Sequence, residues 1–491
     1  MDIREKEVSK DERFVTQITP KSVDFSRWYV DIIRKAELAD YAPLKGMMVI
    51  RPYGYAIWEN IQRLLDKRIK DTGHVNAYFP LFIPETFLQK EMEHLEGFAP
   101  EVAWVTEGGK EQLEERLAVR PTSEAIIGHM YAKWIKSWRE LPLLINQWAN
   151  IVRWEKVTRL FLRTTEFLWQ EGHTAHETFE EAQKETLMIL SLYKEFMETE
   201  LAIPVLSGKK TDREKFAGAL ETYAIEALMS DGKALQMGTS HNLGQHFSKV
   251  FNIRYEDRNQ NLQYVWQTSW GVTTRLIGAL VMSHGDDSGL RFPPQVAPIQ
   301  VVIVPIALGN WKENILPVAK RIAAGLKKKG LRTELDTREE FTPGWKFSEW
   351  EMKGVPLRIE IGPRDIQKKQ VIAVRRDIQE KEVIAMDSLN KKIPEILRNI
   401  QETLFEQALE FQRKNTHEVQ RYEDFKELVE TKRGFLKVPW CGDASCEEKI
   451  KEETMATIRV IPLDQKKEKL AGKCIYCQRK AENLVYFARA Y

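Results

Sequence analysis

The stretch from Arg153 to His176 reads Arg-Trp-Glu-Lys-Val-Thr-Arg-Leu-Phe-Leu-Arg-Thr-Thr-Glu-Phe-Leu-Trp-Gln-Glu-Gly-His-Thr-Ala-His. From residue 161 to 173 its β-branched and aromatic content and the lack of a helical stripe predict a strand. Alternate residues of a strand share a face, which here would present Phe161, Arg163, Thr165, Phe167, Trp169, Glu171 and His173. Buried Arg and Glu are costly without charged partners. The pattern therefore suggests a small zwitterion beside a polyphosphate, although a solvated charged face explains it equally well.

Length and composition limit the class of protein. A chain of 491 residues with 43% hydrophobic residues predicts two to four domains. Its formal charge of +2 neither requires nor excludes a nucleic acid, because RNA binding needs a local basic face. The charged first residues contain no signal peptide, and the longest apolar run, 299–308, is too short to span a bilayer. We therefore expect a soluble cytoplasmic protein.

All the cysteines of the chain lie close to its C-terminus, namely Cys441, Cys446, Cys474 and Cys477. Four residues separate the first pair and two separate the second, so each pair can chelate from one turn. Thiolates are the expected ligands of a closed tetrahedral zinc site. Disulfides are the alternative, but they disagree with an intracellular chain. The spacing predicts one structural Zn²⁺.

Several local patterns predict secondary structure. Apolar residues at three- and four-residue spacing predict a helix over 54–70 that ends before Gly73, and a strand over 75–83, broken by Pro80 and Pro84, follows. Thr122 or Ser123 can cap another helix, and Thr178 can cap a helix that continues to about residue 201. Residues 207–211 mimic the end of a phosphate-binding loop, but the required first glycine is replaced by Ile203. Residues 236–246 predict a glycine-punctuated loop.

The pattern of predicted secondary structure changes after Pro298. Alternating strands and helices between residues 299 and 376 predict an α/β domain. Charged helical sequence covers about 390–432, and the chain ends in an apolar, aromatic run over 483–491 that predicts a strand.

Three stretches together resemble the class II prolyl-tRNA synthetases of the archaeal and eukaryotic type. Arg-Trp-Glu, a short turn and Phe-Leu-Arg-Thr-Thr-Glu-Phe-Leu-Trp-Gln-Glu-Gly-His resemble motif two of that family. The helix over 54–70 and its following strand resemble motif one, which forms the family's dimer interface, and 269–280 resemble motif three with Arg275. The resemblance extends from about Phe14 to Tyr491.

The resemblance implies a fold in three parts. Residues 1–296 would form an α+β catalytic domain with an antiparallel sheet, the class II synthetase fold. Residues 297–400 would form an α/β anticodon-binding domain, and residues 401–491 a small C-terminal zinc-binding α/β domain. The interval between motifs two and three leaves no room for the editing insertion of bacterial-type relatives.

The implied reaction is activation of L-proline by ATP to prolyl adenylate, followed by transfer of proline to the 3′ end of tRNA(Pro). Arg153 and Arg275 would be the catalytic residues, because a planar guanidinium stays charged and binds two oxygens. Proline would contact Thr122, Glu124, Arg153, Phe167, Trp169, Glu171, His173 and His241. ATP, with Mg²⁺, would contact Arg153, Glu155, Arg163, Thr164, Gln236, Thr239, Thr273 and Arg275.

The anticodon would be read by the segment 345–364, with Glu351, Arg358 and Arg364 as candidates, because Glu and Arg side chains recognise guanine edges. For each of these residues taken singly, a solvated helix face or a strand end is the better explanation. A homodimer is expected from motif one. The C-terminal carboxylate of Tyr491 would approach Arg153, or the residue would only close a small core.

Two other functions remain open at this point. The chain could be a catalytically silent relative that only binds tRNA or a regulatory partner. It could also be a sister synthetase for threonine, serine or glycine, which would require different residues around Thr122 and His241.

Overall fold

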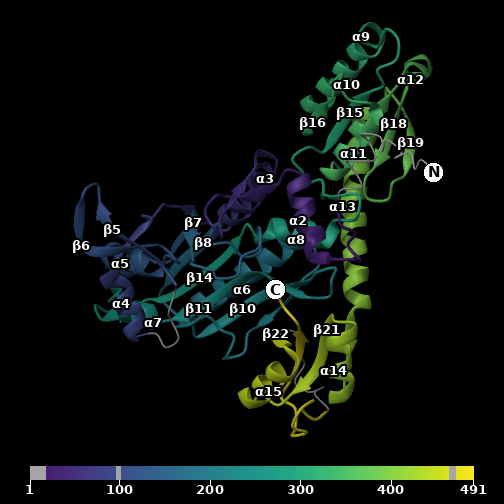
Figure 1. The fold of residues 1–491 in the computed structure, drawn as a ribbon. Coiled ribbons are helices and arrows are strands. Elements are labelled where there is room, and N and C mark those ends of the chain that lie inside the picture. The colour runs from purple at the N-terminus through teal and green to yellow at the C-terminus, as the bar shows by residue number, and fades with distance from the viewer. Residues whose placement is uncertain (1–17, 95–100, 464–471) are drawn as a thin grey trace.

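A computed structural model describes residues 18–94, 101–463 and 472–491. Figure 1 shows a broad central body built on a long sheet, an α/β body above it and a small body below it, the last two connected by one long helix. The beginning of the expected resemblance, residues 14–17, lies outside the described residues. No helix within the described ranges has the length and apolar composition needed to cross a membrane.

The central sheet has eleven strands in the order β20-β21-β23-β22-β9-β10-β11-β14-β8-β7-β3. From β9 to β7 all neighbours are antiparallel, which confirms the predicted antiparallel catalytic sheet. The strands of this part are β3 (Val75–Asn76), β7 (Leu143–Val152), β8 (Glu166–His176), β9 (Leu206–Lys209), β10 (Glu221–Leu228), β11 (Ala234–Gly244) and β14 (Trp266–Thr273).

Four helices pack with this sheet into one core. They are α2 (Phe25–Lys35), α3 (Pro52–Asp71), α6 (Phe179–Thr199) and α8 (Arg275–His284). Helices α6 and α8 contact the strands of the sheet, and α2 and α3 pack against α8. Helix α6 packs across β8, β10, β11 and β14, and Thr178 caps it by accepting from the Glu181 N–H, as predicted. In α3, a Cβ at Gly54 would lie 2.1 Å from the carbonyl oxygen of Leu38, so only glycine permits this approach.

A second hydrophobic core joins the central sheet to a group of smaller elements. These are the three-stranded sheet β4 (Phe82–Pro84), β6 (Glu111–Val119) and β5 (Ala103–Gly108), with helices α4 (Glu85–His94), α5 (Glu124–Trp134) and α7 (His246–Val250). Nearby are the 3₁₀ turn η1 (Trp138–Glu140) and the pair β12 (Arg254–Glu256) and β13 (Leu262–Tyr264). A further pair, β1 (Ala39–Tyr41) and β2 (Met48–Ile50), follows α2. The broken strand expected over 75–83 is two short strands, β3 and β4, in different sheets; Pro80 lies between them, and Pro84 is the last residue of β4.

The upper body in Figure 1 is the predicted α/β domain, a five-stranded sheet in the order β16-β15-β17-β18-β19. Its strands are β15 (Val301–Pro305), β16 (Thr333–Leu335), β17 (Leu357–Ile361), β18 (Gln370–Arg375) and β19 (Lys381–Ala385). Its helices are α9 (Trp311–Asn314), α10 (Leu316–Lys328), α11 (Pro343–Met352) and α12 (Pro363–Lys368).

Helix α13 (Leu389–Lys414) leads from this body to the small C-terminal one. The expected boundary between residues 400 and 401 falls inside α13, and the division of the chain into domains stays a prediction. The last elements are β20 (Thr416–Glu418), α14 (Tyr422–Thr431), β21 (Phe435–Trp440), α15 (Ala444–Thr454), β22 (Thr457–Pro462) and β23 (Asn483–Ala488). Since β22 pairs with β9, the C-terminal strands extend the catalytic sheet itself.

Candidate active site

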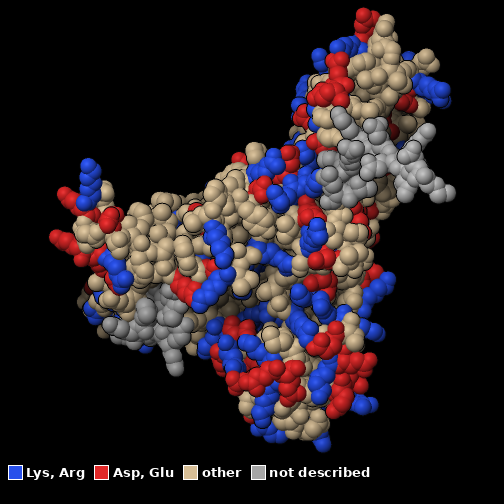
Figure 2. Space-filling view, in the orientation of Figure 1, with Lys and Arg blue, Asp and Glu red and all other residues tan. Residues whose placement is uncertain are grey.

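A cavity of about 340 Å³ opens on the central sheet, and all the residues that the sequence analysis proposed to bind proline or ATP line it. Figure 2 shows basic side chains around a hollow in the middle of this face. The assigned residues that line the cavity are Thr122, Glu124, Arg153, Glu155, Arg163, Thr164, Phe167, Trp169, Glu171, His173, Gln236, Thr239, His241, Thr273 and Arg275. The structure thus brings these residues together, while their roles stay predictions.

Strand alternation explains which side chains of β8 reach the cavity. Phe167, Trp169, Glu171 and His173 occupy alternate positions and all line it. Gln170, on the opposite face, instead accepts a 2.6 Å hydrogen bond from the Tyr193 hydroxyl of α6. The helix therefore covers one face of the sheet and leaves the other for ligands.

Strand register places residues from distant parts of the chain side by side in rows. In one row His173 pairs with Ser269, Ser269 with His241 and His241 with Thr222. In the next, Glu171 lies between Gln147 and Gly271, and Gly271 pairs with Thr239. Each row crosses four strands, which is why the site draws on so much of the sequence.

Two local predictions about this region are wrong. The strand expected from residue 161 begins only at Glu166, because Arg159 and Arg163 close a tight turn and Phe161 adopts a φ of +61°. Residues 236–246, expected to be a loop, form most of β11. Pairing with β10 on one side and β14 on the other satisfies the backbone of β11 despite its glycines.

A buried hydrogen-bond network surrounds Glu171 at one end of the cavity. Its carboxylate accepts from the Ser123 hydroxyl at 2.5 Å and from the Gln147 amide at 2.7 Å, and it contacts His173 Nε2 at 2.9 Å. Burial raises the pKa of Glu171, but these hydrogen bonds and the charge of His173 outweigh it, and the net pKa is lowered. Glu124, close by, accepts a short hydrogen bond from Thr122. This end therefore presents two carboxylates, as recognition of an ammonium group requires.

The pKa values of the two histidines at this end, His173 and His241, shift in opposite directions. Burial lowers the pKa of His173, but the hydrogen bond and charge of Glu171 more than compensate, so that its pKa is raised. Burial, and to a smaller extent His173, lowers the pKa of His241 to about 3. His241 is therefore neutral at pH 7, and its Nδ1 lies 2.9 Å from the Thr222 hydroxyl.

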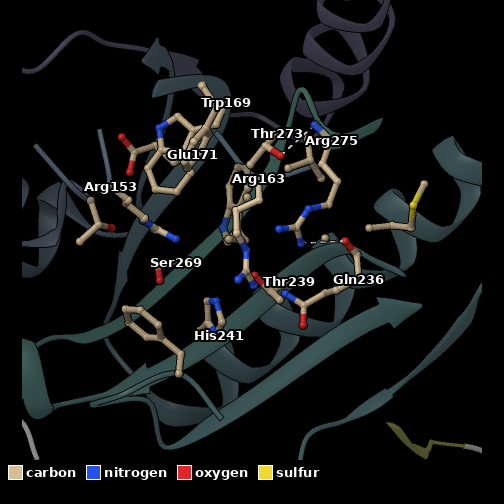
Figure 3. A pocket seen from close by; sticks show the side chains of 18 of the residues that line it. Arg153, Arg163, Trp169, Glu171, Gln236, Thr239, His241, Ser269, Thr273 and Arg275 are labelled. Carbon is tan, nitrogen blue, oxygen red and sulfur yellow. Dashed lines mark hydrogen bonds between the residues drawn. The ribbon is translucent and has the colours of Figure 1, made fainter. Parts of the chain in front are cut away.

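Three arginines enter the same cavity from motifs two and three. Arg153 follows β7, lies 5.7 Å from the centre of the Trp169 ring, and donates from Nε to the Pro121 carbonyl. Arg275 begins α8 and donates to the carbonyls of Leu162 and Gln236. Figure 3 shows Arg163 between these two in the view drawn.

These guanidiniums are only weakly neutralised by the protein. Burial and, to a smaller extent, the positive charge of Arg163 lower the pKa of Arg275 to about 10. Arg163 itself is 3.9 Å from Glu155. A polyanion would relieve this repulsion, because guanidinium groups bind phosphate oxygens in a planar, bidentate way.

Sequence reasoning missed several residues that line or support the cavity. Ser269 occupies the position alternate to Gly271, and Phe216 places its ring 4.8 Å from that of His241. Gln147 supports Glu171 and also accepts from the Phe79 N–H at 2.5 Å. Strand alternation through motif three could have identified Ser269, whereas no local pattern marks Phe216 or Gln147.

The four cysteines form a second candidate site in the small C-terminal body. Their sulfur atoms all lie within 4.8 Å of one another, and Cys441 Sγ is 3.8 Å from Cys446 Sγ and 3.6 Å from Cys477 Sγ. None of them forms a disulfide. Four thiolates about 2.3 Å from a tetrahedral Zn²⁺ would be roughly 3.8 Å apart. The donor set and its spacing therefore fit zinc.

The anticodon candidates lie in the α/β body, where two of them pair with each other. Arg358, on β17, is buried and contacts Glu351 at 2.8 Å and Glu360 at 3.0 Å, with its guanidinium 4.2 Å from the Phe347 ring. Arg364 lies exposed in the first turn of α12.

Comparison with known proteins gives consistent matches along the chain. The model "tRNA synthetase class II core domain (G, H, P, S and T)" matches residues 104–284, "Anticodon binding domain" matches 300–396, and "Prolyl-tRNA synthetase, C-terminal" matches 422–491.

Relatives match over nearly their full length. The proline–tRNA ligase of Natranaerobius thermophilus is 59% identical over 98% of this chain and 99% of its own. That of Alkaliphilus oremlandii is 57% identical over the same shares. The crystal structure of prolyl-tRNA synthetase from Cryptosporidium parvum, complexed with halofuginone and AMPPNP, is 44% identical and covers 96% of this chain and 99% of its own, with a TM-score of 0.92.

Proposed function

This chain belongs to the prolyl-tRNA synthetase family, and on that premise we propose that its central cavity binds proline at the Glu171 end and ATP at the Arg275 end. As a proline–tRNA ligase it activates proline with ATP and transfers the prolyl group to tRNA. The observation that supports the assignment is the meeting of three poorly neutralised arginines with two buried carboxylates in one cavity. Nothing in this site favours a catalytically silent relative.

In the first step the proline carboxylate attacks the α-phosphorus of ATP. A bond forms between a carboxylate oxygen and phosphorus, the bond from that phosphorus to the bridging oxygen breaks, and pyrophosphate leaves with the electron pair. Both reactants are anions, so the site must align them and neutralise charge rather than move protons. We assign the α-phosphate and the proline carboxylate to Arg153, and the distal phosphates to Arg163 and Arg275.

Proline would be recognised at the other end of the cavity, where the charged groups are the carboxylates of Glu124 and Glu171. The ring would lie against Phe167 and Trp169, whose centroids are 6.1 Å apart in an edge-to-face arrangement. The secondary ammonium would donate to Thr122 and Glu124, since it has two N–H donors and one charge. Neutral His241 and the His173–Glu171 pair would close the polar side.

We propose two metal ions for this protein. Mg²⁺ would accompany ATP and help to neutralise its phosphates. Zn²⁺ would be held by Cys441, Cys446, Cys474 and Cys477 and would supply structural cross-linking of the small C-terminal body, which has only a modest core of its own.

The remaining assignments concern tRNA, oligomeric state, location and domains. We propose that Glu351, Arg358 and Arg364 read the anticodon, which requires the Glu351–Arg358 pair to open. If Glu351→Ala and Arg358→Ala both left tRNA charging unchanged, this assignment would fail.

We propose a cytoplasmic enzyme with domains at 1–296, 297–400 and 401–491. Exposed apolar residues on the motif one side, including Val75, Tyr78 and Phe82, support a homodimer.

Proline-dependent exchange of pyrophosphate into ATP tests the central proposal. Arg153→Ala should reduce the exchange rate at least about a hundredfold, as expected for loss of a group that stabilises developing charge. Arg139→Ala is the control, because Arg139 lies on Trp138 outside the cavity. Normal exchange by Arg153→Ala, or equal exchange with threonine, would contradict the proposal.

A further inference from the structure

The segment between β9 and β10, residues 210–220, forms one wall of the cavity. Glu214 and Phe216 line it. The Phe216 N–H donates to the Thr222 hydroxyl at 2.9 Å, and that hydroxyl also contacts His241. Phe216 and His241 therefore form one packed unit at the end assigned to proline.

The outer side of this segment is held by a helix from the other end of the chain. Thr211 donates its hydroxyl to Glu447 of α15 at 2.9 Å, and both residues are buried. Arg213 makes two contacts of 3.0 Å with the carboxylate of Glu448, and Lys451 lies 3.7 Å from Glu214. Three positions of α15 thus engage residues 211–214.

The residues just before this segment are also anchored to the C-terminal body. Lys209 pairs with Ile461 of β22, and the Lys210 ammonium donates to the Arg459 carbonyl at 2.8 Å. A Cβ at Gly208 would lie 2.3 Å from the Ile461 carbonyl oxygen. Close strand packing explains the glycine that made this stretch mimic a phosphate-binding loop.

We propose that helix α15 positions the segment 211–216 and thereby sets the affinity of the enzyme for proline. Glu447 and Glu448 are then positioning residues that act through Thr211 and Arg213 on Phe216. A segment that is already ordered loses less conformational entropy when proline binds. The inference rests on the proposed function, namely that this end of the cavity binds proline.

Thr211→Val tests the proposal with a change that keeps side-chain shape. Loss of a buried hydrogen bond to a carboxylate should raise KM for proline about five- to tenfold, while KM for ATP stays within about twofold, because the ATP end lies on other elements. Thr454→Val is the matched control: Thr454 is buried in the same helix, but its hydroxyl donates to the Ile450 carbonyl, accepts from the Ala456 N–H and does not contact the segment. Its KM for proline should equal that of the wild type.

A charge reversal provides an independent test should Thr211→Val fold poorly. Glu448→Lys should raise KM for proline about twofold, as fits a largely exposed ion pair, and adding Arg213→Glu should restore it. The rise in melting temperature produced by L-proline should change in parallel and needs no catalysis. An unchanged proline KM in both variants, or an equal rise for ATP, would overturn the inference. If Arg153→Ala exchanged normally, the proposed function itself would fail instead.

Discussion

Glu226 is the buried carboxylate where the catalytic sheet meets the C-terminal body, and its replacement offers a sharp stability test. It is completely buried and contacts the Lys210 ammonium at 2.8 Å and Arg459 Nη2 at 2.9 Å. Burial raises its pKa, but the charges of Lys210 and Arg459 outweigh this and lower it. We expect Glu226→Gln to leave two buried cations without their counter-charge.

The expected cost follows from the geometry of the cluster. Removing one partner of a buried ion pair typically costs about 3–5 kcal/mol. Glutamine retains one acceptor oxygen, so we expect about 3 kcal/mol for Glu226→Gln. The triple variant Lys210→Met, Glu226→Leu, Arg459→Met should lose much less, because no unpaired charge remains in the interior.

Urea unfolding followed by tryptophan fluorescence measures these differences. With a slope of about 3 kcal/mol per M, the Glu226→Gln midpoint should fall by about 1 M. Asp40→Asn, in the exposed Arg34–Asp40 pair, is the control and should cost less than about 0.5 kcal/mol. Because a lowered carboxyl pKa stabilises above the unfolded value of 4.5, the difference should shrink as the pH falls through the folded pKa. A loss below about 1 kcal/mol at pH 7 would refute the reasoning.

Three further predictions concern pH, metal and the end of the chain. Burial lowers the pKa of His284 to about 4, whereas in the unfolded state histidine takes up a proton near pH 6.5. The urea midpoint should therefore fall between pH 6.5 and 4, as His284 removes about 3 kcal/mol from the free energy of unfolding. A constant midpoint would contradict this. Purified protein should contain one zinc per chain, and Cys474→Ser should lose it and melt earlier; metal analysis without zinc in the wild type refutes the site. One residue added after Tyr491, whose ring lies 4.8 Å from the Lys233 ammonium, should impair proline activation without changing zinc content, and normal activation would mean that the terminus only packs.

The zinc cluster and the proline end are connected by a short path. Cys446 immediately precedes Glu447 in α15, and Glu447 accepts a hydrogen bond from Thr211, three residues before the cavity-lining Glu214. A metal that fixes the first turn of α15 would therefore also fix the contact with the segment 211–216. If the proposed role of α15 holds, the small C-terminal body contributes to proline binding.

The sequence by itself determined the features that depend on local spacing. Alternation along residues 167–173 identified one cavity face of β8, the Thr178 cap identified the start of α6, and the cysteine spacings identified the candidate metal ligands. Such patterns follow from the period of a strand, the unsatisfied N–H groups of a helix end and the reach of a thiolate pair, all of which are set within a few residues.

Only the tertiary structure decided which distant residues share a site. Gln147 supports Glu171 because β7 and β8 pair in one particular register, and residues 236–244 form a strand because neighbours on both sides satisfy their backbone. Phe216 reaches His241 because β10 pairs with β11 and places Thr222 beside both residues. Glu447 reaches Thr211 because β22 adds to β9 and joins the two bodies. Register and strand addition depend on hydrogen bonds between segments far apart in the chain, so no local period in the sequence contains them.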